Sequence, residues 1–498
     1  MIRALVPALG LVAILAGPAA AEPAPARGGT ITVALNAEPP HLDPTASTSQ
    51  EIARMLYGNV LEGLVAFDDE GRIVPLLAER WTVSRDGLVW TFALEEGVKF
   101  HDGQALMASA VKAKFDRART AASGHTNPAY YKDIASIETP DPRTVVFRLA
   151  RANADFLFNL ARPDSVVHAP GDLDAQKTHP VGTGPFRFVA WDRGSAVRLA
   201  RFEGYHVAGL PYLDGAVFRF LPDQNAQMAA LVAGDLDVVG YALSPENALK
   251  VRGDRALRLV QGWSTTEITV GLNNSRKPFD DVRVRRAVAH ATNKPEIVEG
   301  AMFGFGAPIG AHMSPGERYY VDTSGTYPYD PGKAKALLRE AGHPDGFTAT
   351  FSLPAPYPYE RRAGELLAAQ LARVGIKLTL EVVEWTTWLS KIFRNADYDM
   401  TIIGHSEPFD IGVYANPQYY FRYDSAEFRA LLEKGQATLD EAERARIYGD
   451  LQRILARDAV NDWLYSAPYL AATRASVEGW WRNQPTPAMH LARVFKTR

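Results

Sequence analysis

Residues 75–103 read PLLAERWTVSRDGLVWTFALEEGVKFHDG, and no other stretch of the chain says as much about the fold. Asp86-Gly87 is a turn dipeptide, and the β-rich run LVWTFAL follows it at 88–94, so we predict a β-hairpin. A second turn lies in KFHDG, and residues 108–120 repeat Ala, Val and Phe along one face of a helix. A hairpin followed by an amphipathic helix indicates a mixed α/β fold.

The same mixture continues on both sides of this stretch. Residues 30–35 (TITVAL) alternate as a half-buried strand, and the polar, proline-containing segment 36–43 interrupts them. A strand that ends in such a loop is a natural place for a binding site, so Asn36, Glu38 and His41 are candidate ligand contacts. Further strands are predicted at 144–149, 186–191, 376–383 and 399–404, and helices at 225–233, 331–341 and 362–373. Interleaved strands and helices exclude an all-β barrel and a helical bundle.

Composition excludes several classes of protein. The 498 residues carry 54 Lys and Arg against 57 Asp and Glu, and this near balance gives no reason to expect a nucleic-acid partner. Cysteine is absent, which excludes disulfides, thiolate zinc sites, iron–sulfur clusters and lipid attachment through cysteine. Length alone suggests about three domains, although a single large two-lobed fold can also have this many residues.

The N-terminus predicts export. Arg3 precedes the short apolar stretch 4–16, and small residues at 19–21 offer a cleavage site before Glu22, so residues 1–21 are a predicted signal peptide. Residues 22–29 are expected to be a flexible leader. No later stretch reaches 18 apolar residues, so we expect no membrane insertion. Without a cysteine for a lipid anchor, the expected location is the periplasm.

Catalytic motifs are absent from the sequence. There is no G-x-S-x-G elbow, no H-E-x-x-H helix and no phosphate-binding G-K-[ST] loop. The 11 histidines show no i, i+4 pairing, and we predict neither a metal nor a cofactor. Two distant carboxylates could still form a hydrolase site, which sequence does not reveal.

Aromatic residues, in contrast, are abundant, with 9 Trp, 20 Tyr and 22 Phe. Several stand in polar, loop-like surroundings, where rigid rings with a polar edge suit ligand capture, although most aromatic residues are ordinary core residues. The candidates for ligand binding are Tyr357, Trp385, Trp388 and Tyr414.

The quoted stretch also resembles the signature block of the family 5 extracellular solute-binding proteins, the dipeptide-, oligopeptide- and nickel-binding components of ABC transporters. The resemblance continues in order through PVGTGPF at 180–186, AGDLD at 233–237, NNSRKPFDDVRVRRAVAHATN at 273–293, and YDP at 329–331 with LLREAG at 337–342. It covers the chain from about residue 28 to the C-terminus.

This resemblance implies a large bilobal periplasmic-binding-protein-like fold, type II-like and of cluster C, whose lobes close on a ligand. The first lobe would combine residues 30–270 with 480–498 and contain an extra subdomain at about 71–180. The second lobe would span 271–479, with the crossings near 271–274 and 478–480. Closing on ligand shifts the open–closed population toward a shape that a permease recognises.

The ligand anchors of the family carry over only in part. Peptide-binding members place a Trp after the apolar strand of the second lobe and an Asp three residues later. This chain has His405 and Pro408 at those positions, so Glu407 or Asp410 would supply the carboxylate from a shifted loop. Phe409 belongs to the same predicted loop. Arg361, with its neighbour Arg362, would bind a ligand carboxylate.

We therefore expect a non-enzymatic, monomeric periplasmic binding protein that captures a peptide or peptide-like solute and delivers it to an ABC permease. Within that class the alternatives are an opine-like amino-acid conjugate, a metal chelate or an oligosaccharide. From another class, a secreted hydrolase with two catalytic carboxylates stays open.

Overall fold

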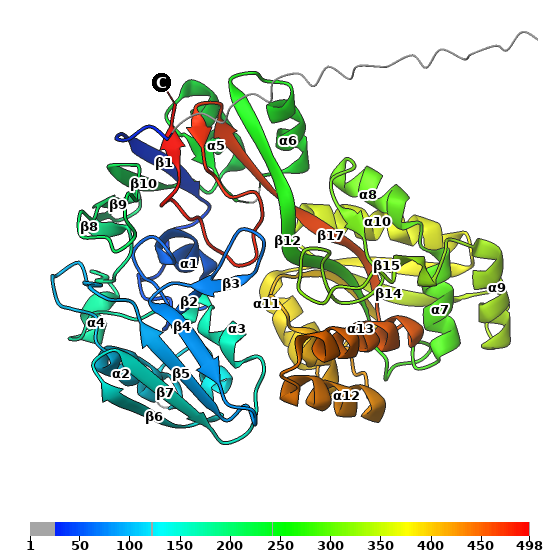
Figure 1. Cartoon of the computed structure of the whole chain (residues 1–498). Helices are drawn as coiled ribbons and strands as arrows, with labels where there is room; N and C mark the ends of the chain where they lie inside the picture. Colours follow the sequence, from blue (N-terminus) through cyan, green and yellow to red (C-terminus); the bar gives the residue numbers. More distant parts are fainter. Residues whose placement is uncertain (1–24, 121–122, 242, 498) are drawn as a thin grey trace, which may run out of the picture.

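The computed structural model describes residues 25–120, 123–241 and 243–497. The chain forms two lobes side by side, with the N-terminal half in one, residues from about 270 to 460 in the other, and the C-terminal residues back in the first (Figure 1). The predicted signal peptide, residues 1–21, lies outside the described residues. Among the described residues, no helix is both long and apolar enough to cross a membrane.

One eleven-stranded sheet runs through both lobes. Its order is β15-β14-β16-β12-β17-β11-β1-β10-β9-β8, and β13 pairs with β17 beside this path. The first lobe contributes β1 (Thr30–Leu35), β8 (Phe186–Asp192), β9 (Ala196–Arg201), β10 (Gly215–Phe220) and β11 (Val238–Val239). The second lobe contributes β13 (Ala307–Pro308), β14 (Phe347–Pro354), β15 (Ile376–Val383) and β16 (Met400–His405).

Two long antiparallel strands, β12 (Leu257–Leu272) and β17 (Asp462–Arg474), join the lobes. At one end β17 pairs with β11 of the first lobe, and at the other end β12 pairs with β16 of the second lobe. Their register shifts between Trp263 and Glu267, in the middle of β12, where the partners on β17 are Pro468 and Ser466. The lobe boundaries at 270/271 and 479/480 stay predictions, and this register shift lies earlier in the sequence than both.

A separate four-stranded sheet forms a subdomain of the first lobe. Its order is β4-β5-β7-β6, with β4 (Ala78–Val83), β5 (Val89–Leu94), β6 (Ile134–Asp141) and β7 (Thr144–Leu149). The hairpin β4–β5 turns at Gly87, whose φ of 72° suits glycine. Helices α2 (Ala108–Ala118) and α3 (Phe156–Leu160) share its core, which includes Phe92, Phe115 and Phe147.

Helices cover the sheet in both lobes. The first lobe has α1 (Gln50–Leu56), α4 (Leu173–Gln176), α5 (Gln224–Ala233) and α6 (Pro245–Arg252). The second has α7 (Val282–Ala291), α8 (Lys294–Met302), α9 (Pro331–Glu340), α10 (Pro358–Ala372), α11 (Trp385–Thr387), α12 (Ala426–Ala437) and α13 (Glu441–Arg457). Two short ribbons complete the fold, β2 (Val65–Phe67) with β3 (Ile73–Pro75) and β18 (Val477–Glu478) with β19 (Phe495–Lys496).

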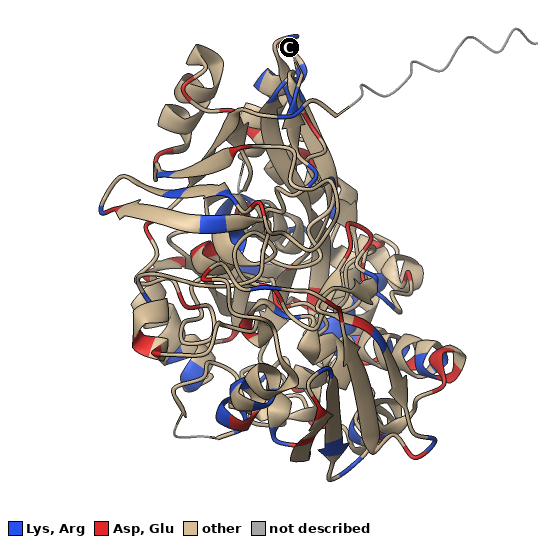
Figure 2. Ribbon diagram, turned by 60° about the vertical axis from the view of Figure 1, so that its left-hand side comes forward, with Lys and Arg blue, Asp and Glu red and all other residues tan. Residues whose placement is uncertain are grey.

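The predicted mixed α/β fold is confirmed. Charged residues of both signs are interspersed over both lobes, in keeping with the nearly balanced charge (Figure 2). The subdomain and helices α12 and α13 face each other across the space between the lobes (Figure 1).

Candidate functional site

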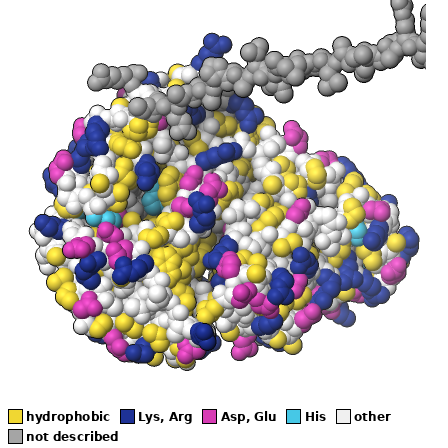
Figure 3. Space-filling model, viewed as in Figure 1, with side chains coloured by type: hydrophobic (Ala, Val, Ile, Leu, Met, Phe, Trp, Pro, Cys, Tyr) yellow, Lys and Arg dark blue, Asp and Glu magenta, His cyan; other side chains and the backbone are white. Residues whose placement is uncertain are grey.

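A cavity of about 500 Å³ lies between the lobes. Figure 3 shows the furrow along this boundary, with hydrophobic side chains gathered beside it. The first-lobe side of the wall comes from the segment 67–73, Trp81 and the segment 155–158. The second-lobe side comes from the loop after β13, the loop 406–410 and Arg444, and β12 contributes Trp263 and Thr265. The lining includes Phe67, Arg72, Trp81, Asp155, Phe158, Trp263, Thr265, Glu317, Arg318, Tyr319, Pro408, Phe409 and Arg444.

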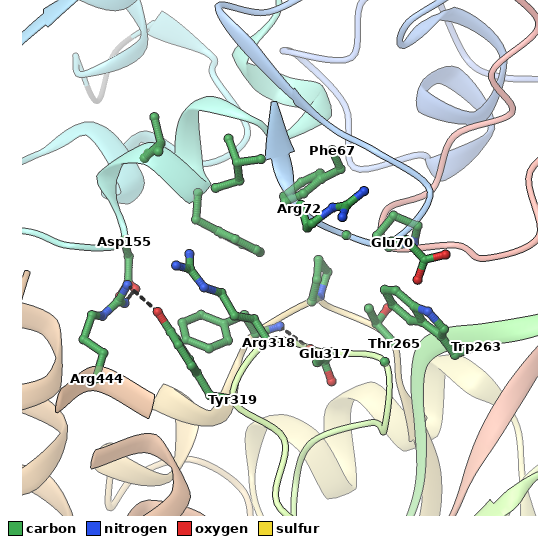
Figure 4. A pocket seen from close by; sticks show the side chains of 18 of the residues that line it. Phe67, Glu70, Arg72, Asp155, Trp263, Thr265, Glu317, Arg318, Tyr319 and Arg444 are labelled. Carbon is green, nitrogen blue, oxygen red and sulfur yellow. Dashed lines mark hydrogen bonds and ion pairs between the residues drawn. The ribbon is translucent and has the colours of Figure 1, made fainter. Parts of the chain in front are cut away.

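At one end of the cavity, an ion pair joins the two lobes (Figure 4). Arg444 in the first turn of α13 pairs with Asp155, which precedes α3 of the subdomain, and it also donates to the Tyr319 hydroxyl at 3.2 Å. Arg444 is buried, and its guanidinium lies 5.3 Å from the centre of the Tyr319 ring. Breaking a buried pair of this kind leaves an uncompensated charge, so the pair favours contact between the lobes.

At the other end, Trp263 and Thr265 of β12 face the cavity beside Glu70 (Figure 4). The register shift between Trp263 and Glu267 interrupts the regular pairing here. Thr265 then donates its hydroxyl to the carbonyl of Ser406 at 2.9 Å, which ties the hinge strand to the loop after β16.

Glu317 fixes the middle of the second-lobe wall. Its carboxylate accepts hydrogen bonds from the backbone N–H of Ser314 at 2.7 Å and of Phe409 at 2.8 Å. Burial raises the pKa of Glu317 to about 7, although these two hydrogen bonds oppose the rise. The residues on either side, Gly316 and Arg318, also line the cavity.

The loop 406–410 divides the space between the lobes. Pro408 and Phe409 line both the main cavity and a second one of about 560 Å³, which Asp410 also lines. Glu407 and Pro408 line a third, of about 180 Å³, on the side of α1. Phe409 packs against Phe158 of the subdomain, so this loop contacts the opposite lobe.

Directly behind the loop, two histidines surround the Asp410 carboxylate. His312 Nε2 lies 2.6 Å from Oδ1, and His405 Nδ1 lies 3.9 Å from Oδ2. Burial opposes ionisation of Asp410, yet the two histidines outweigh it and hold its pKa well below the ordinary value. Glu267 stands next to His312, and burial together with the Glu317 and Asp410 charges raises the pKa of Glu267 well above normal.

The structure brings together seven of the residues predicted from the sequence. Phe409, Asp410 and Glu407 line the cavities between the lobes, and His405 and Tyr414 are buried directly behind them, where the Tyr414 hydroxyl lies 3.2 Å from His312 Nδ1. Trp388 belongs to the same aromatic cluster, because its ring packs against Tyr420, and Trp385 stacks on Trp388 at 5.0 Å.

The other predicted residues line none of these three cavities. Glu38 accepts a hydrogen bond from the Trp191 indole at 3.0 Å, and Asn36 accepts one from Gln227 at 2.9 Å, so both lie in the first lobe. His41 accepts a hydrogen bond from the backbone of Asp43. Tyr357 packs on Trp385, and Arg361 donates to the Ala355 carbonyl.

Several lining residues were missed by the sequence analysis. Trp81 stands in the most informative stretch but was assigned only to a hairpin, and Trp263, Phe158, Glu317 and Arg444 were not singled out. His312 also went unnoticed. No sequence pattern marks these residues, because the residues that each one contacts lie far away along the chain and come close only on folding.

Comparison with known proteins decides the family. Residues 72–427 match the model of the bacterial extracellular solute-binding proteins, family 5. The chain belongs to this family. The family resemblance seen in the sequence is therefore confirmed, and with it the bilobal fold class.

Individual relatives of this family 5 protein cover nearly its whole length. The Glutathione-binding protein GsiB of Pectobacterium atrosepticum is 32% identical over 460 residues, which is 85% of each chain. The structure of the periplasmic binding protein AgaA in complex with agropinic acid, from A. tumefaciens R10, is 27% identical with a TM-score of 0.77 and covers 94% of this chain and 99% of that one. The periplasmic binding protein DppA of Helicobacter pylori in complex with the peptide STSA is 25% identical with a TM-score of 0.78, covering 95% and 99%.

Proposed function

We propose that this family 5 protein is the substrate-binding component of an ABC importer and captures a peptide or peptide-like solute between its lobes. The observation that carries the proposal is the cavity of about 500 Å³ between the lobes, lined by aromatic rings and by charged groups of both signs. Such a lining suits a zwitterionic ligand with apolar parts.

The wall is divided between the lobes in a way that favours capture by closure. Phe67, Trp81 and Phe158 come from the first lobe, whereas Arg318, Tyr319 and Phe409 come from the second. A ligand that touches both groups gains contacts only in the closed state, so its binding shifts the population toward that state.

The named relatives support the choice of ligand class. GsiB is described as a glutathione-binding protein, and the DppA structure contains the peptide STSA. We infer that glutathione and other short peptides are the first ligands to test. Because these relatives are binding proteins, we also propose that this protein is exported to the periplasm, delivers its ligand to a membrane permease and catalyses no reaction.

Calorimetric titration with glutathione, a dipeptide and a tetrapeptide tests the proposal, after native mass spectrometry has shown whether the purified protein retains a ligand. We expect saturable binding of at least one of these peptides, with a change in tryptophan fluorescence. Trp263→Phe should reduce that change because Trp263 lines the cavity, whereas Trp191→Phe, in the first lobe outside the three cavities, should not.

Two outcomes would contradict the proposal. Binding that leaves fluorescence unchanged in the parent protein and in both variants would place the ligand elsewhere. Release of hydrolysis products from any of the three peptides would show that the protein is a secreted hydrolase rather than a binding protein.

A further inference from the structure

His312, His405 and Asp410 place three potential metal ligands close together. Each offers one ligand atom, and the three atoms lie within 4.8 Å of one another. A tetrahedral ion with bonds of about 2.0–2.2 Å keeps its donors about 3.3–3.6 Å apart. Here His312 Nε2 is hydrogen-bonded to Asp410 Oδ1 at 2.6 Å and His405 Nδ1 lies 3.9 Å from Oδ2, so small side-chain adjustments would reach that separation.

Both histidine rings are held from behind. The Nδ1 atom of His312 lies 3.5 Å from the Glu267 carboxylate and 3.2 Å from the Tyr414 hydroxyl, which in turn accepts a hydrogen bond from Asn461. The Nε2 atom of His405 lies 2.9 Å from the Tyr420 hydroxyl. Each ring therefore has one nitrogen engaged by an outer partner and the other directed at Asp410, the usual arrangement around metal-bound histidines.

Asp410 is the carboxylate of the cluster that a cation would neutralise. Glu267 and Glu317 lie beside it, and Glu267 is only 3% exposed, so its burial favours the uncharged form. Among the described residues, no Lys or Arg forms an ion pair with any of these three carboxylates. Buried carboxylates are normally paired with a cation or coordinate a metal.

The site is reachable from the space between the lobes. His312 and His405 are buried, but the Asp410 side chain is 19% exposed and lines the second cavity. Three protein ligands therefore leave a coordination position that water or a ligand can fill.

We propose that His312, His405 and Asp410 bind a divalent transition-metal ion of borderline softness, with Zn²⁺ the ion that fits best. Imidazole nitrogens with one carboxylate are a ligand set for such ions rather than for Mg²⁺ or Ca²⁺. The ion joins the loop after β13, the end of β16 and the loop 406–410. It therefore fixes the position of Phe409 in the wall of the main cavity. The inference does not depend on which solute occupies that cavity.

The direct test is calorimetric titration of Zn²⁺ into the full chain after removal of metals with a chelator. We expect one site per chain. Co²⁺ should give the intense visible absorption of a four-coordinate ion and be displaced by Zn²⁺. His312→Gln and His405→Gln should each weaken Zn²⁺ binding at least about 100-fold, and Glu267→Gln about 10-fold or more, since it removes only an outer partner.

The matched control is His179→Gln, which changes an exposed histidine that contacts Thr178 in the first lobe. It should leave Zn²⁺ affinity unchanged. Absence of Zn²⁺ and Co²⁺ binding by the parent protein, or binding that His179→Gln weakens as much as His405→Gln, would overturn the site. If a histidine variant does not fold, Asp410→Asn replaces it, with its thermal unfolding measured first. Peptide binding without metal binding would refute this inference and leave the proposed function standing.

Discussion

At the scale of single residues, the ring of Phe409 contacts both lobes. Its ring lies 5.5 Å from that of Phe158 in the subdomain and 4.7 Å from that of Tyr448 on α13. The φ angle of Phe409 is 60°, in the left-handed region that non-glycine residues rarely adopt. The hydrogen bond from its backbone N–H to Glu317 helps to hold this conformation.

Comparing Phe409→Ala with Phe409→Gly separates the ring from the backbone. Both variants lose the aromatic contacts, but glycine adopts a positive φ without the strain that alanine keeps. We expect Phe409→Gly to be more stable than Phe409→Ala by about 1 kcal/mol in urea unfolding. Equal stability of the two would show that the backbone at residue 409 relaxes.

Glu360 is a second residue whose contribution to stability can be measured. It is buried at the start of α10 and accepts a hydrogen bond from the backbone N–H of Gly404 at 3.1 Å. A Cβ atom at position 404 would come within 3.0 Å of its Oε1 atom, so this approach favours glycine there. Burial raises the pKa of Glu360 to about 8, although the hydrogen bond opposes the rise.

This raised pKa makes stability depend on pH. Between its unfolded pKa near 4.5 and its folded pKa near 8, Glu360 binds more protons in the folded state, so the unfolding free energy falls as pH rises. Glu360→Gln removes this dependence. In this variant the fall in the unfolding free energy between pH 5 and pH 8 should be smaller than in the parent protein by about 2–5 kcal/mol. Chemical denaturation at a series of pH values measures it.

Glu365→Gln, on the exposed face of the same helix, is the control and should follow the parent profile. A parallel profile for Glu360→Gln would mean that Glu360 ionises without penalty.

At this scale the sequence predicted part of the site. The loop 406–410 was predicted from the family resemblance, whose ligand anchors follow the apolar strand at 399–404, and the structure puts it between the lobes. Asn36, Glu38 and His41 were chosen only because they follow a predicted strand, and their hydrogen bonds lie within the first lobe. Position after a strand tells which residues reach a sheet edge, but not which edge faces the other lobe.

At the scale of elements, local patterns predicted bounds well. The expected strands at 30–35, 144–149 and 376–383 coincide with β1, β7 and β15, and the helix predicted to end near 341 is α9. Asp330 caps α9, because its side chain accepts a hydrogen bond from the N–H of Lys333. The register shift in β12 was not predictable, since it depends on β17 about 200 residues away.

Helix α13 carries Arg444 into the cavity and begins at a capped end. The Asp440 side chain accepts a hydrogen bond from the N–H of Glu443 at 2.8 Å. Asp440→Ala should lower the unfolding free energy by about 1 kcal/mol, because it leaves that N–H without its cap. Urea denaturation measures the loss.

Asp450→Ala, at an exposed position further along α13, serves as the control and should change stability by less than about 0.5 kcal/mol. A similar loss in both variants would indicate a general effect of removing negative charge from the helix.

At the scale of the whole molecule, the lobes touch on both sides of the hinge. On the side of the cavity, the N–H of Ala154 donates to the carbonyl of Gln436 beside the Asp155–Arg444 pair. On the side of α6, Arg362 pairs with Glu246 at 2.9 Å. Arg362 was predicted to bind a ligand carboxylate. In the structure it binds the carboxylate of Glu246, which belongs to the first lobe.

Asp155→Asn should shift the ligand-free protein toward an open form. Removing the charge leaves the buried Arg444 without its counter-ion, at a cost of at least about 1.4 kcal/mol to the closed state, or a tenfold change in the open-to-closed ratio. Small-angle X-ray scattering should report a larger radius of gyration. Asp133→Asn, whose partner Arg151 lies in the same subdomain, should leave the radius unchanged.

The way the first lobe is closed by the C-terminal residues sets the order in which the chain can fold as it is made. Ala488, Met489, Leu491 and Val494 complete a core begun by Ile31 and Val33. The side chain of Asn59 bonds the backbone of Met489 and Leu491, partners more than 400 residues later in the sequence. Contacts this distant form late and slowly, so a growing chain keeps its first lobe unfinished until residues 488–494 have been made.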